Sequence, residues 1–325
     1  MNLNPILQVN DFSERIVRTA VGSEADGKRI DVYLSERFDY LSRHKWQELI
    51  KDGKISLNGV RTRCSRRLQT GEEITFIAEG EEPEVDFSYS ILYEDDYFFV
   101  IDKSGNLPCH PAGPYFKNTL WHHLSERHGK VYIVNRLDRE TSGILIVAKT
   151  PEICSEMIEI LNREDSRKIY IAAVYGRFEH EVDADGWLLP DLESEVRKKR
   201  CFIMGKDIPD DLSEDAKVES SRTLLRPLES GDEYSLVEAE LKTGRMHQIR
   251  ATLYSLGFPL LGDKLYGPDD TIFLRFISDE MTNDDYEQLI FVRQALHAWR
   301  LEFTHPVNGE KMQFEAPWPE SLSIA

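Results

Sequence analysis

Apolar and polar residues near the start of the chain follow a helical pattern and then a strand pattern. Apolar side chains recur every three or four positions over residues 30–38 and 43–53, which predicts two helices. The runs 54–62 and 68–78 place short apolar stretches around an Asn-Gly pair and a Thr-Gly pair, which indicates strands joined by tight turns. This part of the chain therefore predicts a compact unit of two helices and a hairpin.

From residue 85 the pattern changes to longer strands and short helices. The strands that we predict fall in 89–94, 97–103, 131–134, 144–148, 168–176 and 235–244, with a helix over 153–164 and a helix or turn over 248–257. Residues 178–222 are polar and irregular, and we interpret them as a variable insertion or loop. The fold class that we expect is α+β, with a large, mixed, mainly antiparallel sheet and flanking helices beside a small α/β domain.

Composition sets wide limits on the class of protein. The 325 residues suggest about two domains, and 41% hydrophobic residues exclude a wholly disordered chain. No apolar run reaches the ~18–20 residues that a membrane helix needs, and the first residues lack the pattern of a secretory signal. Four scattered cysteines without a Cys-x-x-Cys pair predict a reducing, cytoplasmic setting and no metal site.

Charge is distributed unevenly along the chain. The formal net charge of −18 argues at first against a nucleic-acid partner. Residues 27–71, however, contain eleven Lys or Arg and five acidic residues, while residues 72–96 contain ten acidic residues and no Lys or Arg. Such a change of sign indicates a domain with its own partner followed by an acidic linker. The boundaries that we predict are an extension over 1–20, a small domain over 21–80, a linker over 81–90 and a large domain over 91–325.

Two polar segments between apolar strands carry the candidate chemistry. In 135–143, Asp138 is a carboxylate that two strands could hold in a cleft, although a charged surface turn is the simpler interpretation. In 243–250, Arg250 begins an apolar stretch. Because a buried arginine needs a carboxylate partner, we expect Arg250 to pair with Asp138.

Several motifs in a fixed order resemble those of the RluA-type family of RNA pseudouridine synthases. They are R-L-D-x-x-T-S-G at 136–143, K-x-Y-x-A-x-V-x-G at 168–176, T-G-R-x-H-Q-I-R at 243–250 and G-x-P-x-x-G-D-x-x-Y-G at 257–267. The resemblance spans about residues 88–320. Residues 27–77, with R-I-D-x-x-L and the later N-G and G-E-E-I, resemble an S-four-type RNA-binding module.

The family resemblance implies a reaction and roles for individual residues. Uridine would be isomerised to pseudouridine without cofactor or metal. Asp138 would be the nucleophile, and Arg250, with Arg245 as second choice, its neighbouring cation. Tyr170 would be the active-site aromatic residue, and Arg136 would fill the space of a flipped-out base. The remaining substrate contacts that we expect are Thr141, Arg245, His247 and Gln248.

The two resemblances imply an RNA partner, with ribosomal and transfer RNA both open. We expect no membrane partner, and a monomer is the default for this kind of enzyme. A basic face would hold phosphates without reading bases. The residues that we expect on it are Arg29, Arg43, Lys45, Lys51, Lys54, Arg61, Arg63, Arg66 and Arg67.

Departures from the family motifs leave the target RNA open. Asn135 and Thr252 stand where relatives often have His, and residues 102–105 differ from the usual Asn-Lys-Pro-x-Gly. Two other classes of function remain: a non-catalytic RNA-binding or ribosome-assembly protein that kept the fold, and another carboxylate enzyme, such as a glycoside hydrolase. The second class needs a further carboxylate, for which Glu140 is the nearest candidate.

Overall fold

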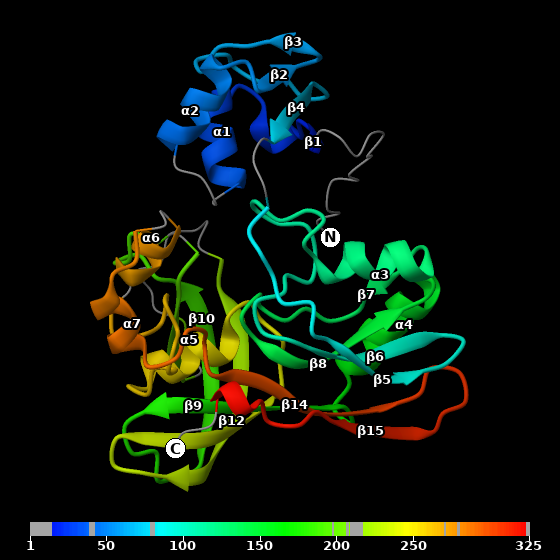
Figure 1. Ribbon diagram of the computed structural model, residues 1–325, viewed down its shortest axis with the longest axis vertical. Helices are drawn as coiled ribbons and strands as arrows, with labels where there is room; N and C mark the ends of the chain where they lie inside the picture. Colours follow the sequence, from blue (N-terminus) through cyan, green and yellow to red (C-terminus); the bar gives the residue numbers. More distant parts are fainter. Residues whose placement is uncertain are drawn as a thin grey trace. The chain divides into compact units, whose positions relative to one another are not determined.

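The computed structural model describes residues 15–38, 43–78, 82–196, 198–205, 208, 217–269, 271–277 and 280–322. The chain divides into a small unit, residues 1–84 with 111–118, and a large unit, residues 85–110 with 119–325 (Figure 1). Each unit is described by itself. No helix among the described residues has the length and apolar character needed to cross a membrane.

The small unit packs two helices on one antiparallel sheet, in the strand order β1-β4-β2-β3. Asn58 and Gly59 have φ angles of 49° and 75°, which the tight turn between β2 and β3 requires. Both predicted helices, the hairpin and the later strand are confirmed. The elements are β1 (Arg15–Ala20), α1 (Ile30–Arg37), α2 (Arg43–Lys51), β2 (Ile55–Leu57), β3 (Val60–Arg61) and β4 (Glu73–Ala78).

Strand β1 lies within the segment that we expected to be an extension. It pairs residue by residue with β4, from Arg15 opposite Ala78 to Ala20 opposite Glu73. This part of the chain is therefore an edge strand of the small sheet, whereas residues 1–14 lie outside the described residues. Six residues with two arginines among them gave no clear alternation in the sequence.

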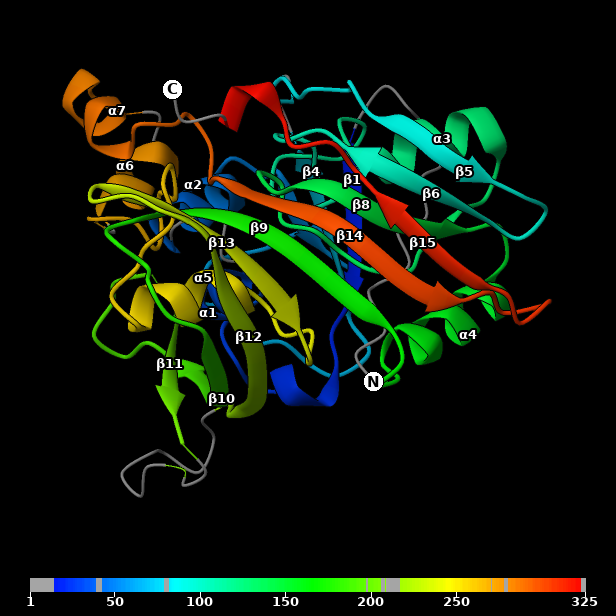
Figure 2. The same ribbon diagram turned by 90° about the horizontal axis from the view of Figure 1, so that it is seen from below.

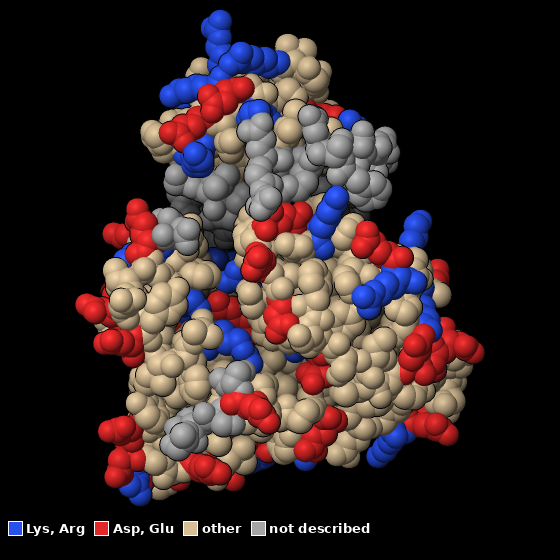
Figure 3. All heavy atoms as spheres, in the orientation of Figure 1, with Lys and Arg blue, Asp and Glu red and all other residues tan. Residues whose placement is uncertain are grey.

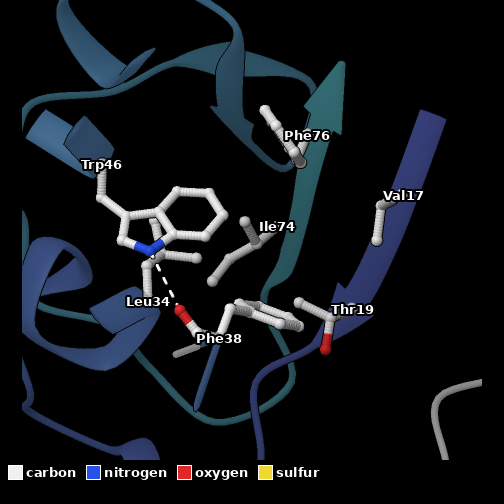
Figure 4. Close-up of a pocket in the computed structure, with 7 residues that line it drawn as sticks. All are labelled: Val17, Thr19, Leu34, Phe38, Trp46, Ile74 and Phe76. Carbon is white, nitrogen blue, oxygen red and sulfur yellow. Dashed lines mark hydrogen bonds between the residues drawn. The ribbon is translucent and has the colours of Figure 1, made fainter. Parts of the chain in front are cut away.

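The core of the small unit is built around Trp46 of α2, which is 1% exposed. Its indole Nε1 donates a hydrogen bond to the Phe38 carbonyl oxygen at 3.2 Å (Figure 4). Side chains of α1, of the residue after it and of strands β1 and β4 surround the ring. Together with Trp46, they line a narrow cavity: Val17, Thr19, Leu34, Phe38, Ile74 and Phe76. The apolar spacing in the sequence thus marks the face that α1 and α2 bury against the sheet.

The large unit is a mixed sheet with helices on both faces (Figures 1 and 2). The main strand order among the described residues is β11-β10-β12-β13-β9-β14-β8-β6-β5, with β15 beside β14 and β7 beside β8. All pairs are antiparallel except β14 with β8. The predicted α+β class with a mainly antiparallel sheet is confirmed. The strands are β5 (Ser90–Glu94), β6 (Phe98–Lys103), β7 (Tyr132–Ile133), β8 (Ser142–Ala148), β9 (Arg167–Tyr175), β10 (Val182–Pro190), β11 (Arg200–Met204), β12 (Glu219–Ser230), β13 (Tyr234–Leu241), β14 (Leu296–Thr304) and β15 (Lys311–Glu315).

Three apolar clusters join the helices to this sheet. Helix α4 packs against β8 and β14, and α3 packs against the opposite side chains of β6 and β8. Helix α5 covers β9, β10, β12 and β13. The helices are α3 (Leu120–His128), α4 (Pro151–Leu161), α5 (Gln248–Ser255), α6 (Thr271–Ile277) and α7 (Asn283–Leu289). Tyr170 of β9 contacts the clusters of both α3 and α5 and therefore lies between them.

The interpretation of residues 178–222 as an irregular loop is wrong. They contain β10, β11 and the start of β12, which pair as antiparallel strands. The buried face of β10 includes Ala184, Gly186 and Leu188, and two of these side chains are too small to show a hydrophobic alternation. Gly186 is needed because a Cβ there would lie 2.1 Å from the Ile203 carbonyl oxygen.

The parallel contact between β8 and β14 fixes the loop that precedes β8. Gly143 pairs with Ala298, and its φ angle is 106°. A Cβ atom at this position would lie 2.2 Å from the Ala298 carbonyl oxygen, so only glycine allows the two backbones to approach. The 134–141 loop is thereby held at the centre of the sheet.

Replacing Gly143 with alanine should destabilise the large unit by about 3 kcal/mol, since steric overlap adds to an unfavourable φ angle. Gly129→Ala is the matched control, because Gly129 also has a positive φ, 77°, but nothing within 4 Å of the added Cβ. Denaturant unfolding of both variants measures the difference. Equal losses of stability would show that the close approach to Ala298 is unimportant.

Candidate active site

A buried arginine between two carboxylates forms the centre of the candidate site. The Arg250 guanidinium on α5 donates from Nε and Nη2 to the two carboxylate oxygens of Asp263, at 2.6 and 2.9 Å. Its Nη1 donates to Asp138 Oδ2 at 2.6 Å. Arg250 is 8% exposed and the Asp263 side chain is fully buried, whereas the Asp138 side chain remains 34% exposed. The predicted contact between Arg250 and Asp138 is confirmed.

Asp263 positions Arg250 because its own carboxylate is fixed from several sides. The backbone N–H groups of Leu265 and Tyr266 donate to Asp263 Oδ1 at 3.0 and 2.9 Å. The preceding Gly262 has a φ of 72°, and a Cβ there would lie 2.0 Å from the Arg293 carbonyl oxygen. A bidentate pair with such a carboxylate fixes the plane of the guanidinium. The remaining nitrogen, Nη1, is therefore directed at Asp138.

The electrostatics of the site keep Asp138 ionised. Burial alone would raise the pKa of its carboxyl group, but the nearby His247 and Arg250, with hydrogen bonds from Arg250 and Gln294, lower that pKa well below its usual value. Burial, Arg250 and Lys198 lower the pKa of His247 to about 4, against the attraction of Asp138 and Asp263. The imidazole is thus neutral at pH 7, and the cation beside Asp138 at that pH is Arg250.

His247 has a left-handed backbone conformation, and its side chain contacts Tyr266. It precedes α5 with φ 58° and ψ 19°, in the left-handed region that a non-glycine residue adopts rarely. Its Nδ1 lies 3.1 Å from the Tyr266 hydroxyl, which accepts the Arg200 backbone N–H at 2.9 Å. The Tyr266 hydroxyl therefore joins the Arg200 backbone to the His247 imidazole.

Two lysines fix the loop that carries Asp138. Lys103, which is fully buried, donates from Nζ to the carbonyl oxygens of Ser104 and Arg139 at 2.7 and 3.1 Å. Burial lowers the pKa of Lys103 to about 8. On the other side of the loop, Lys264 donates to both carboxylate oxygens of Glu140 at 2.9 and 3.0 Å. The loop is therefore tied to β6 and to the segment that carries Asp263.

Tyr170 is the aromatic residue that the family resemblance assigned to the active site. Burial, Asp138 and Cys109 all raise the pKa of its hydroxyl, so the hydroxyl stays protonated at neutral pH. Among the described residues, none forms a hydrogen bond with that hydroxyl. Tyr170 therefore presents a ring and a protonated hydroxyl close to the Asp138 carboxylate.

The other predicted substrate contacts fall into two groups. Arg136 is exposed, and Arg245 is exposed with its Nε donating to the Ser220 carbonyl oxygen at 3.1 Å. Thr141 and Gln248 are buried instead. The Thr141 hydroxyl accepts a hydrogen bond from Gln294, which also reaches Asp138. Nothing places Arg245 at Asp138, so Arg250 is the partner of that carboxylate.

The Gln248 amide, which we expected to contact substrate, makes four hydrogen bonds inside the protein. The oxygen accepts hydrogen bonds from the Thr243 hydroxyl and the Arg245 backbone N–H at 2.8 and 3.0 Å. The nitrogen donates to the Arg222 carbonyl oxygen and the Thr223 hydroxyl at 3.0 and 2.9 Å. Gln248 thus joins the start of α5 to β12 and the turn before it.

Four further residues of the site were not assigned roles from the sequence: Lys103, Asp263, Tyr266 and Gln294. Asp263 and Tyr266 belong to a motif whose spacing could have suggested them, since a buried Asp after Gly262 needs a cation. Lys103 occupies the lysine position of the family's Asn-Lys-Pro-x-Gly motif, and Gln294 begins the segment 294–298 that also resembles the family, but neither comparison assigned the residue a role. Within the described residues, no three His, Cys, Asp or Glu side chains gather as metal ligands.

Comparisons of sequence and of fold with known proteins all point to one protein family. A family model described as RNA pseudouridylate synthase matches residues 97–255. The ribosomal large subunit pseudouridine synthase D of Nitrosomonas europaea is 31% identical over 322 residues, covering 96% of this chain and 87% of the relative. The protein of the same name from Xanthomonas campestris is 33% identical, covering 94% and 90%. Human RNA pseudouridylate synthase domain containing 1 has a similar fold, with a TM-score of 0.55 and 24% identity over 75% of this chain and 89% of that one.

The pKa of Asp138 should depend on Arg250. In the double variant Arg250→Gln, Asp263→Asn, which replaces the charged pair by amides, burial remains while the cation is lost, so the Asp138 pKa rises above its usual ~3.9. Carboxyl-carbon NMR titration measures this shift. Arg245→Gln is the control and should leave the Asp138 titration unchanged; an unshifted Asp138 in the double variant would contradict the role of Arg250.

Proposed function

The chain belongs to the RNA pseudouridylate synthase family, and we propose that it converts uridines of ribosomal RNA to pseudouridine with Asp138 as the nucleophile. The observation that carries this proposal is the ionised Asp138 carboxylate, partly exposed beside the buried Arg250. The names of its bacterial relatives support ribosomal RNA as the substrate. We further propose that the enzyme acts as a monomer in the cytoplasm. The four free cysteines support the reducing compartment of this proposal.

The reaction needs a nucleophile and a proton carrier and no change of oxidation state. The bond between uracil N1 and ribose C1′ breaks, and a bond between C5 and C1′ forms. The C5 proton leaves and N1 gains a proton, so atoms balance. Attack by Asp138 on ribose C1′ or on uracil C6 both require an ionised carboxylate, which Arg250 maintains.

Tyr170 is suited to bind the uracil ring and to transfer a proton. Its ring, held between two apolar clusters, can stack on the uracil. Its hydroxyl is protonated and has no hydrogen-bond partner among the described residues, so it can give a proton to N1 and, once deprotonated, take up the proton that leaves C5.

Arg136 is suited to the space that a flipped base leaves. A uridine inside a stack cannot reach Asp138, and extruding it costs a few kcal/mol. The exposed Arg136 side chain stands two residues before Asp138, and a planar guanidinium can stack on bases and bind phosphate. We propose that it occupies the vacated position.

The structure gives little support to a glycoside hydrolase. Such an enzyme needs a second free carboxylate near the first. Glu140 is instead bound to Lys264 and to Arg139, at 2.9 and 3.0 Å, and its side chain is 15% exposed. A non-catalytic RNA-binding protein is the remaining alternative, and it does not require an ionised Asp138.

We propose that the small unit binds RNA phosphates through a basic surface. Buried Asp31 accepts hydrogen bonds from Arg29, Arg43 and Gln47, at 2.9, 2.9 and 2.6 Å, and so fixes two half-exposed guanidinium groups. Arg63, Arg66 and Arg67 are exposed on the same unit. Figure 3 shows Lys and Arg side chains gathered on this unit. Such a surface supports binding without base specificity.

Asp138→Asn should abolish pseudouridine formation while keeping RNA affinity, because the amide is not a nucleophile but has the same shape. Nucleoside analysis of ribosomal RNA treated with the purified protein measures the product. Asp183→Asn, an exposed carboxylate of β10, is the control and should keep full activity. Full activity of Asp138→Asn would exclude the proposed nucleophile; an inactive wild type would favour the non-catalytic alternative. Modification of transfer RNA alone would overturn the proposed substrate.

Removing two cations from the small unit should reduce the salt dependence of RNA binding. In Lys51→Gln, Arg63→Gln, each lost phosphate contact lowers the slope of log K against log salt by about 0.7–0.9. Titrations at several salt concentrations measure the slope. The control, Lys130→Gln with Lys311→Gln, removes two exposed cations of the large unit and should keep the wild-type slope. Equal slopes in both variants would contradict RNA binding by this surface.

A further inference from the structure

Helix α6 lies outside the motifs of the site, yet it contacts two of the site's cations. Its residues 271–277 follow the last of the four motifs and lie beyond the residues that the family model matches. The Lys264 ammonium lies 4.9 Å from the centre of the Phe276 ring on this helix, and the Arg139 guanidinium carbon lies 5.1 Å from it. Both distances are within the about 6 Å over which an aromatic ring attracts a cation.

The two cations meet at one carboxylate, that of Glu140. The Lys264 ammonium donates to Glu140 Oε1 and Oε2 at 2.9 and 3.0 Å and to the Val292 carbonyl oxygen at 2.7 Å. Arg139 Nη2 donates to Glu140 Oε1 at 3.0 Å. The Lys264 side chain is only 5% exposed. An ammonium held away from water needs compensation, which Glu140, the carbonyl oxygen and the Phe276 ring supply together.

The ion pair of Lys264 and Glu140 joins the two segments that carry the carboxylates around Arg250. Glu140 stands two residues after Asp138, and Lys264 directly follows Asp263. A displacement of this ion pair would therefore move the Asp138 carboxylate relative to Arg250. Because a shift of about 1 Å at a reacting group can slow a reaction strongly, the ion pair matters for the position of the proposed nucleophile.

The Phe276 ring has a support of its own, separate from the loops that it contacts. The preceding residue, Arg275, donates from Nε to Oδ2 of the buried Asp285 on α7 at 2.9 Å. Phe273 and Leu274 pack against the apolar cluster that α5 covers. Helices α6 and α7 lie side by side in both views (Figures 1 and 2). The ring is therefore fixed by α6, and the two cations are placed against it.

We propose that Phe276 is a positioning residue of the candidate site, which holds the ion pair of Lys264 and Glu140 and, through it, the loop of Asp138. This inference rests on the proposed function. Phe276 acts through its neighbours, so its loss slows the chemical step and leaves RNA binding little changed. A helix outside the family motifs thus contributes to the geometry of the site.

Two variants separate the aromatic ring of Phe276 from its apolar bulk. Phe276→Leu keeps an apolar side chain but removes the ring, and Phe276→Tyr keeps the ring. The probe is a purified transcript of large-subunit ribosomal RNA. With Phe276→Leu, we expect kcat to fall about 5- to 10-fold while KM stays within about twofold, because the nucleophile is displaced and the RNA contacts are not. Phe276→Tyr should keep kcat within about twofold of the wild-type value.

A double-mutant cycle with Lys264 tests the route by which Phe276 acts. Lys264→Met removes a cation that the ring holds, so adding Phe276→Leu to it should lower kcat much less than Phe276→Leu does in the wild-type background. If the two losses multiply in full, Phe276 does not act through Lys264 and the proposal is wrong.

Phe314→Leu is the matched control, because Phe314 of β15 is also partly buried and stacks on Phe303. Equal kcat values for Phe276→Leu and Phe314→Leu would contradict the proposal. A higher KM at unchanged kcat would show that the ring contacts RNA instead, which equally overturns it. Thermal unfolding identifies a variant that does not fold, and Phe276→Met then takes the place of Phe276→Leu. Failure of the proposed function is seen separately, as absence of pseudouridine in the wild-type sample.

Discussion

The arrangement of the large unit depends on one buried cation. Removing a guanidinium from water costs several kcal/mol unless carboxylates and hydrogen bonds replace the water. Asp263 supplies that compensation for Arg250 inside the protein, and Asp138 supplies it at the surface. The same contact that stabilises Arg250 keeps Asp138 ionised and oriented. Folding and chemistry therefore make the same demand on these three residues, because loss of Arg250 would leave both carboxylates without the cation that compensates them.

The scaffold serves this contact by bringing together loops that are far apart in sequence. Gly143 lets β8 approach β14, which fixes the loop before β8. Gly262 lets the chain turn against Arg293, which fixes Asp263. Lys264 and Glu140 then join the two loops directly. A carboxylate that is positioned by rigid strands and crossed ion pairs loses little entropy when substrate arrives, which is the advantage of a preorganised site.

The sequence predicted those parts of the molecule that depend on the spacing or the type of neighbouring residues. Helical spacing located α1 and α2, and the rule that a buried arginine needs a carboxylate predicted the contact between Arg250 and Asp138. Contacts over long sequence separations had no such signal. The Gln248 amide has the residue type of a substrate contact, and only the positions of Thr223 and Arg222 show that it is used internally. Strand β10 was missed because Ala184 and Gly186 bury too little apolar surface to mark a face.

The net charge of the chain does not by itself decide whether RNA can bind, because the positions of individual cations matter more at short range. A charge of −18 opposes RNA at long range, so binding must depend on cations placed where phosphates come close. At Asp138 this requirement is strictest, because the proposed nucleophile has to stay negative and yet must admit a polyanion. Arg250 cannot meet both needs, since Asp138 and Asp263 already neutralise it. A cation other than Arg250 is therefore needed in a site that uses an ionised carboxylate on RNA, and Arg136, exposed two residues before Asp138, is the cation nearest to Asp138 in the sequence with its side chain open to solvent.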